Sequence, residues 1–273
     1  MWSRTFAAAG NSARRGHLRR PTLRSERRRR RGAVSDTPST RRHIGESRFD
    51  AIDAAPYRPF RRRHQAAKKE KRHVCVEDLA AVAEDLVKTG VARHESLGIR
   101  GGSNGGLLVG NFYVQRPELV GAVVCAVPFS VEISTYSPKT RSNAQVPLLD
   151  MKRYSHLLAG ASWRAEYGDP DIPEEWSYLK YNSAYHNVDA SKAPFPKLLM
   201  TTSTKDDRVH PYHARSFVKR LQELGVPDVY YYENIEGGHG GAADAKQSAY
   251  VVALYQDFLF CALGGKRAGC GDP

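Results

Sequence analysis

Residues 97–106 read LGIRGGSNGG, a short apolar run that ends in four glycines enclosing Ser103 and Asn104. The run predicts a strand over 97–100, and the apolar positions beyond residue 106 predict a helix to about Gln115. A chain that passes from strand to helix in so few residues must turn sharply, and glycine leaves the backbone room to do so. The stretch therefore predicts a strand, a tight turn carrying Ser103, and a helix.

Further elements are predicted by apolar and β-branched runs for strands and by three- and four-residue apolar steps for helices. The helix 76–89, for example, has one apolar stripe made of Leu79, Val82, Ala83 and Leu86. The predicted strands are 120–127, 197–202 and 229–235, and the other helices are 212–224 and 242–263. Because strands and helices alternate, we expect an α/β fold with a mostly parallel sheet and helices on both faces.

The pattern Gly101-x-Ser103-x-Gly105 is typical of the turn on which α/β-type hydrolases hold a nucleophile. The pattern is weak by itself, but its position between a strand and a helix strengthens it. On such a turn the seryl oxygen stands above the strand ends, and the N–H of Asn104 can point at a developing oxyanion.

A serine nucleophile needs a base, and the base needs an acid that orients it. Asp206 follows the second-last predicted strand and His239 the last, which is the usual chain order of the three groups. Taken singly, His239 is equally well an ordinary loop histidine, and Asp206 or Asp207 a helix cap. Their order and their places at strand ends favour a catalytic triad.

Three motifs resemble those of the prolyl oligopeptidase family, from about residue 64 to residue 263. They are GGSNGG at 101–106, DDRV at 206–209 and EGGHG at 236–240. The resemblance implies an α/β-hydrolase-type catalytic domain over 64–265 that cleaves short peptides after proline through an acyl-enzyme. It assigns the nucleophile to Ser103, the acid to Asp206 and not Asp207, and the base to His239.

The segment 160–168, GASWRAEYG, is similar to the family segment whose tryptophan stacks on the substrate proline. By that match Trp163 and Tyr167 form the wall of the pocket, and Val209 lines it. An aromatic slot suits proline, which is apolar and lacks an N–H. Arg208 would donate hydrogen bonds to the carbonyl before the proline. The alternative for Trp163 is a packed core tryptophan.

The basic charge of the chain is confined to its beginning. Residues 1–72 hold 22 Lys and Arg and 6 Asp and Glu, whereas the others hold 20 and 23. The arginine run 27–31 has no interleaved aromatic residues, which favours a disordered basic leader over 1–60 rather than a nucleic-acid-binding segment. The acid-free start, 1–23, resembles a mitochondrial presequence. We expect a cytoplasmic protein, with mitochondria as the alternative.

Two departures from the family pattern stand out. The family's β-propeller and first hydrolase strands are replaced by the leader, so the sheet is expected to be incomplete at its N-terminal side. No tyrosine in a matching context supplies a second oxyanion donor; Tyr57 is near, but its surroundings differ. A polar insert occupies 129–147, and deletion of 127–145 would restore the run AVPLLDM, which suggests a retained intron or else a family-specific loop.

The cysteines, two histidines and the C-terminal residues lead to further expectations. The four cysteines lack metal or disulfide spacing and are expected to be reduced thiols. His210 and His213 are expected at the surface or as helix caps, and 266–273 as a tail. We expect a peptide substrate, no cofactor or metal, and no nucleic acid or membrane partner; the sequence does not indicate an oligomeric state. The alternatives are an esterase, or a catalytically impaired fragment whose basic leader binds nucleic acid or membrane.

Overall fold

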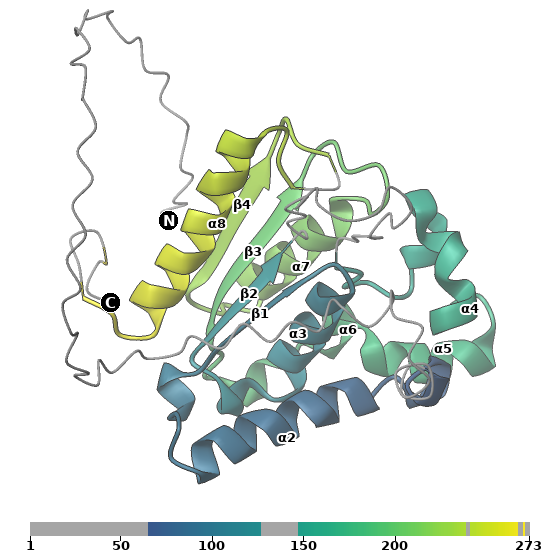
Figure 1. Ribbon diagram of the computed structural model, residues 1–273. Helices are drawn as coiled ribbons and strands as arrows, with labels where there is room; N and C mark the ends of the chain where they lie inside the picture. The colour runs from purple at the N-terminus through teal and green to yellow at the C-terminus, as the bar shows by residue number, and fades with distance from the viewer. Residues whose placement is uncertain (1–64, 127–146, 239–240, 267–269, 271–273) are drawn as a thin grey trace, which may run out of the picture. The chain divides into compact units, whose positions relative to one another are not determined.

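The computed structural model describes residues 65–126, 147–238, 241–266 and 270 (Figure 1). The expected leader 1–60, the catalytic candidate His239 and all of the expected insert except Pro147 lie outside the described residues.

The core of the fold is a four-stranded sheet in which every neighbouring pair is parallel. Its strands are β1 (Gly98–Gly102), β2 (Ala122–Ala126), β3 (Lys197–Ser203) and β4 (Val229–Asn234), in that spatial order (Figure 1). The register pairs Gly102 with Ala126 and Ser203 with Asn234, so the carboxyl ends of neighbouring strands lie level. The α/β fold with a parallel sheet is therefore confirmed.

Helices cover both faces of this sheet. They are α2 (Val74–Lys88), α3 (Asn104–Gln115), α7 (Tyr212–Glu223) and α8 (Ala245–Ala262). Alternate residues of β2 show the division, because Val123 and Cys125 pack with α3 and α7, whereas Val124 and Ala126 pack with α8. All five residues of β2 are buried, as expected of a strand covered on both faces.

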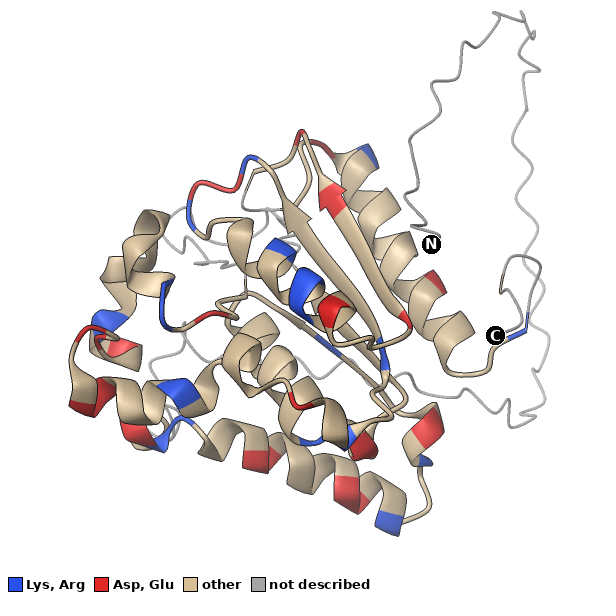
Figure 2. Ribbon diagram, turned by 180° about the vertical axis from the view of Figure 1, so that it is seen from behind, with Lys and Arg blue, Asp and Glu red and all other residues tan. Residues whose placement is uncertain are grey.

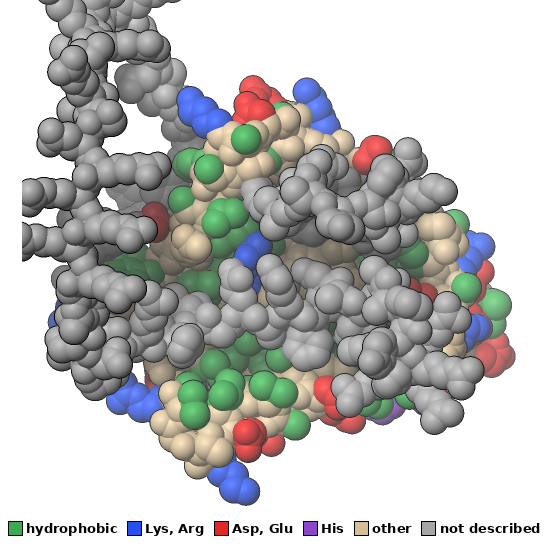
Figure 3. All heavy atoms as spheres, in the orientation of Figure 1, with side chains coloured by type: hydrophobic (Ala, Val, Ile, Leu, Met, Phe, Trp, Pro, Cys, Tyr) green, Lys and Arg blue, Asp and Glu red, His purple; other side chains and the backbone are tan. Residues whose placement is uncertain are grey.

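Helix α2 packs against α3 with a different stripe from the one its sequence suggests. Val76, Leu79, Ala80 and Ala83 are buried, whereas Val82 is 47% exposed. Figure 3 shows apolar side chains among charged ones along this outer surface. The prediction for Val82 was wrong because apolar steps in the sequence fit two adjacent faces of the helix, and only contact with α3 selects one.

The segment between β2 and β3 consists of short helical pieces that the sequence did not predict. They are η4 (Tyr154–His156), η5 (Leu158–Trp163), α4 (Arg164–Tyr167), α5 (Pro173–Leu179), η6 (Lys180–Asn182), α6 (Ala184–Asn187) and η7 (Ala190–Lys192). Three further 3₁₀ turns are η1 (Lys69–Lys71), η2 (His94–Ser96) and η3 (Pro117–Leu119).

Two of the four cysteines are not reduced thiols. Cys261, in the last turn of α8, forms a disulfide with Cys270, and their Cα atoms are 5.2 Å apart. The chain reverses after α8 at Gly264, where φ is +86°, and this reversal brings together residues whose sequence spacing carries no signal. Cys75 and Cys125 are free, as expected.

The surface of the described residues carries charges of both signs. Figure 2 shows acidic and basic positions along α2 and around α4 and α5, whereas the strands are mostly uncharged. Among the described helices, none has both the length and the apolar character needed to span a bilayer.

Candidate active site

Ser103 occupies a sharp turn between β1 and α3. Its backbone has φ 61° and ψ −124°, a conformation that costs a non-glycine residue on the order of 1–3 kcal/mol. Gly101 shows how tight the turn is, because a Cβ there would lie 2.1 Å from the carbonyl oxygen of Gly105. The close contacts of this turn therefore hold Ser103 in a strained conformation at the start of α3, and strain of this kind is common at functional sites.

The beginning of α3 provides a positive electrostatic end beside this serine. The N–H of Leu107 donates to the carbonyl of Ser103 at 3.0 Å and closes the first helical turn. The first N–H groups of a helix have no carbonyl partner within the helix, and the helix dipole adds positive charge there. The N–H of Asn104 belongs to this set, which is the geometry that stabilises an oxyanion.

Asp206 lies in the loop that leaves β3. It is buried, and its Oδ1 accepts hydrogen bonds from the N–H groups of Arg208 and Val209, both at 2.9 Å. Asp207 is exposed to solvent. A carboxylate must be held in one orientation to direct a histidine, so burial and backbone hydrogen bonds support Asp206 over Asp207 for that role.

Asn234, at the end of β4, holds both flanks of the loop that carries His239. Its Oδ1 accepts the N–H groups of Glu236 and Gly237, each at 2.9 Å. Its Nδ2 donates to the carbonyl of Gly241 at 2.9 Å. The sequence did not predict this role, because an asparagine at the end of a strand does not by itself indicate which backbone groups of the following loop it binds.

The sheet brings the nucleophile and acid loops to one edge. Because all strands run in the same direction (Figure 1), the loops after β1, β3 and β4 leave from the same edge of the sheet. Strands β1 and β3 are two positions apart, about 10 Å at the usual strand spacing. Ser103 and Asp206 therefore flank a space that a histidine from the β4 loop is suited to bridge, and the triad stays a prediction because His239 is outside the described residues.

The residues predicted for the substrate pocket share one apolar cluster. Trp163, Tyr167 and Val209 are buried, and Trp163 retains 8% exposure. The cluster also contains Leu107, Leu148, Met151, Tyr154 and Leu179. The N–H of Ala159 donates to the carbonyl of Arg208 at 3.1 Å, so the acid loop is attached directly to the segment that carries Trp163. The predicted pocket residues are thus adjacent in space, although 42 or more positions separate Val209 from the aromatic pair.

A partly buried arginine that the sequence did not indicate, Arg72, contacts the residue after the proposed nucleophile. Arg72 donates from Nη2 to Oδ1 of Asn104 and from Nη1 to Oε1 of Glu166 at 3.0 Å. Its guanidinium lies over the ring of Tyr167, 5.2 Å from the centroid. Burial works to lower the pKa of Arg72, but Tyr167, Cys75 and Glu166 more than offset this and raise it above its ordinary value.

Two histidines near the acid loop were expected at the surface or as caps. His210 does cap α7, since its Nδ1 accepts the N–H of Tyr212 at 3.0 Å. His213 is instead fully buried. The expectation was wrong because His213 precedes Phe217 and Leu221 by one and two helical repeats and so lies on the buried face of α7.

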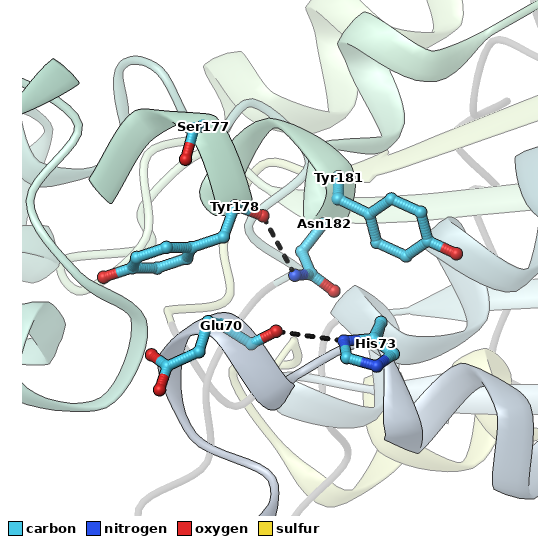
Figure 4. Close-up of a pocket in the computed structure, with 6 residues that line it drawn as sticks. All are labelled: Glu70, His73, Ser177, Tyr178, Tyr181 and Asn182. Carbon is cyan, nitrogen blue, oxygen red and sulfur yellow. Dashed lines mark hydrogen bonds between the residues drawn. The ribbon is translucent and has the colours of Figure 1, made fainter. Parts of the chain in front are cut away.

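A surface hollow of about 400 Å³ lies away from these groups, between the start of α2 and helices α5 and η6 (Figure 4). Its lining contains none of the predicted site residues and consists of Glu70, His73, Ser177, Tyr178, Tyr181 and Asn182. Among the described side chains, no group of three or more His, Cys, Asp or Glu is arranged to hold a metal ion.

Comparison with known proteins agrees with the motifs. A model of the prolyl oligopeptidase family matches residues 61–266. An uncharacterized peptidase, y4nA of Sinorhizobium fredii, is 45% identical over 197 residues, covering 72% of this chain and 24% of that protein. The prolyl endopeptidase of Dictyostelium discoideum is 30% identical over 200 residues, covering 71% of this chain and 24% of that protein.

Solved structures show the same relation. A post-proline cleaving enzyme from Rickettsia typhi superposes with a TM-score of 0.62 at 40% identity, covering 73% of this chain and 26% of that one. The chain spans about a quarter of the length of the curated relatives named here. A family model that covers residues 61–266, and relatives that share the fold as well as the sequence, lead to one assignment: this chain belongs to the prolyl oligopeptidase family.

Proposed function

We propose that the chain is a serine peptidase that hydrolyses peptide bonds through an acyl-enzyme. The observation that carries the proposal is Ser103 in a strained turn at the N-terminus of α3, within a family of peptidases. Ser103 attacks the carbonyl carbon while His239 takes its proton and later returns it to the leaving amine. Asp206 orients the imidazole, and the Asn104 N–H stabilises the oxyanion.

The substrate class that the pocket residues support is a short peptide with proline before the cleaved bond. Trp163, Tyr167 and Val209 lie in one apolar cluster next to the acid loop, and an aromatic wall suits the flat, apolar proline ring. Relatives support the same choice, since a solved structure at 40% identity is of a post-proline cleaving enzyme. Arg208 is proposed to bind the carbonyl on the amino side of the proline.

The first experiment tests the nucleophile. The purified full chain is incubated with a fluorophosphonate probe, and the labelled residue is located by mass spectrometry. Labelling at Ser103 that is absent in Ser103→Ala supports the proposal. An intact, folded chain that does not label at Ser103 overturns it.

The second experiment tests the substrate. Initial rates are compared for three chromogenic substrates: a peptide with proline before the reporter, the same peptide with alanine there, and a p-nitrophenyl ester. Preference for the proline peptide supports post-proline cleavage. Ester turnover without peptide cleavage indicates an esterase. Equal rates on the two peptides contradict the proposed preference for proline.

A further inference from the structure

The side chain of Arg72 joins three separate parts of the candidate site. It leaves the chain between η1 and α2, reaches Asn104 at the start of α3, and pairs with Glu166 in α4. Only 12% of this side chain is exposed, and 24% of that of Glu166. The hydroxyl of Tyr167 donates to the same Oδ1 of Asn104 at 3.2 Å. Arg72, Asn104 and Tyr167 therefore form one closed set of contacts.

We infer that Arg72 is a positioning residue, which fixes the Asn104 peptide relative to the Tyr167 wall. The inference rests on the proposed function, in which Asn104 provides the oxyanion donor and Tyr167 a pocket wall. Arg72 does not contact the substrate in this scheme. It acts through Asn104, because the Arg72 guanidinium and the Tyr167 hydroxyl both donate to Oδ1 of that side chain.

The chemistry of the guanidinium explains why an arginine fits this place. Its planar fork donates in two directions at once, here to an amide oxygen and to a carboxylate, whereas the ammonium of lysine is a compact point of charge. A charge removed from water needs a partner, and Glu166 supplies it at 3.0 Å. The ring of Tyr167 takes the remaining face of the guanidinium.

The position of Asn104 makes such a restraint useful. Asn104 is the first residue of α3 and directly follows the strained Ser103. Both hydrogen bonds to its Oδ1 restrain the side chain and, through it, the peptide whose N–H is proposed to bind the oxyanion. A displacement of about 1 Å in a catalytic group can cost about 10²-fold in rate. The same contacts set the distance between the oxyanion donor and the wall of the pocket.

Lys69 offers a matched control on the same short segment. Its Nζ pairs with Oε1 of Glu175 at 2.9 Å, so it also ties η1 to the helices after β2. Unlike Arg72 it is substantially exposed, and it makes no contact with Asn104 in the described structure. Figure 4 shows Glu70 and His73, which directly follow Lys69 and Arg72 in the sequence. They face Tyr178 and Tyr181 across the hollow. Loss of the Lys69–Glu175 ion pair is therefore expected to weaken the contact between η1 and α5 without changing the hydrogen bonds of Asn104 beside the Ser103 turn.

The experiment uses the full chain and the variants Arg72→Met, Arg72→Lys, Lys69→Met, Asn104→Ala and the double variant of Arg72→Met with Asn104→Ala. Hydrogen–deuterium exchange is followed in peptides covering 101–110, and kcat and KM are measured on the proline peptide. We expect Arg72→Met to speed exchange in 101–110 by about tenfold or more and to lower kcat by about ten- to a hundredfold, the range of a charge-assisted hydrogen bond. Lys69→Met is expected to change neither the exchange rate in 101–110 nor kcat by more than about twofold.

Two further results separate positioning from general stabilisation. Arg72→Lys is expected to keep the melting temperature close to that of the unchanged protein but to show the lowered kcat, because it cannot serve both acceptors. The double variant is expected to lose no more than the more damaged single variant, since both changes break the same contact.

The outcomes that overturn the inference are equally definite. Unchanged exchange in 101–110 after Arg72→Met refutes it, and so do additive losses in the double variant. If the unchanged protein neither labels at Ser103 nor cleaves peptides, the proposed function fails, while the exchange measurement still decides whether Arg72 holds the turn.

Discussion

One buried side chain, that of Asn234, binds both flanks of the segment that contains His239, and replacing it is a sharp test of the triad. Asn234 accepts two N–H groups on one flank of the loop and donates to the Gly241 carbonyl on the other. A further bond from its Nδ2 reaches Oε1 of Gln247 in α8 at 3.0 Å. The variant Asn234→Asp keeps the shape and the acceptor but turns the donor into an oxygen that faces two other oxygens.

The magnitude follows from those contacts. Two hydrogen bonds are lost, at about 0.5–1.5 kcal/mol each, and the buried carbonyl of Gly241 loses this donor, whereas Oε1 of Gln247 still accepts the N–H of Ala243. We expect the free energy of unfolding to fall by about 2–4 kcal/mol and the melting temperature by about 4–16 °C. Because this change releases the flank at Gly241, next to the segment that contains the proposed base His239, kcat should fall by about 10²-fold if His239 acts as the base.

The assay compares Asn234→Asp with a matched control, Asn187→Asp. The Nδ2 of Asn187 also donates to two oxygens, the carbonyls of Lys180 and Tyr181, both at 2.9 Å, but it lies outside the candidate site. Peptide hydrolysis and fluorophosphonate labelling are measured below the melting temperature of each variant. The control should be labelled at the rate of the unchanged protein. If Asn234→Asp is also labelled and turned over at that rate, the loop does not depend on Asn234 and the reasoning is refuted.

Four other predictions follow from the same structure. Gly101→Ala should abolish labelling of the nucleophile because its Cβ has no room, whereas Gly90→Ala, which has open space but φ +74°, should cost only about 1 kcal/mol of stability. Trp163→Ala should raise KM for the proline peptide and spare ester hydrolysis if the ring lines the pocket; a fall of about 3–5 kcal/mol in stability with unchanged KM would make it a core residue. Burial lowers the pKa of His213 to about 4, so between pH 6.5 and 4 the unfolded chain binds a proton that the folded chain does not. Urea unfolding should therefore show stability falling by about 3 kcal/mol as the pH drops through that window, and His213→Gln should flatten the dependence. Sequencing of the transcript should show whether codons 127–145 are removed from its main form; an mRNA that keeps them ends the intron hypothesis.

The centre of the sheet was predictable because β2 and β3 are buried on both faces and read as apolar runs. Even there the sequence did not set the ends. The strand predicted over 120–127 begins at Ala122 in the structure. Just before it, Gly121 passes so close to the chain before β1 that a Cβ there would lie 2.3 Å from the carbonyl oxygen of Glu95. Such a close approach depends on a partner 26 positions away, which no local pattern reveals.

The segment between β2 and β3 was not predictable for a related reason. Its helical pieces are mostly three to seven residues long, too short to show an apolar period. They are held by distant contacts, such as the bond from Lys152 Nζ to the carbonyl of Pro170 at 2.6 Å and that from the hydroxyl of Tyr154 to the carbonyl of Gly168. Pieces this short gain their stability from tertiary packing rather than from propensity.

Some residues of the candidate site could likewise be predicted from the sequence, and others could not. Ser103 and Asp206 were found because their chemistry is tied to strand ends, and a parallel sheet places strand ends at one edge without further information. Arg72 was missed because its partner Asn104 lies 32 positions away in the sequence. Asn234 was missed because an asparagine at a strand end does not by itself indicate which backbone groups of the following loop it binds.

The two ends of the expected insert lie beside one residue of α3, Gly106. A Cβ on Gly106 would lie 2.8 Å from the Cβ of Pro147 and 3.2 Å from the carbonyl oxygen of Ala126. The chain therefore leaves the described fold at Ala126 and returns at Pro147 beside the same residue of α3. From Pro147 it runs directly into the buried residues Leu148 and Leu149, which pack in the apolar core. Because both ends lie beside Gly106, we expect that Val146 can join them in a version of the chain without 127–145, and that β2 and the turn at Ser103 keep their conformation in it.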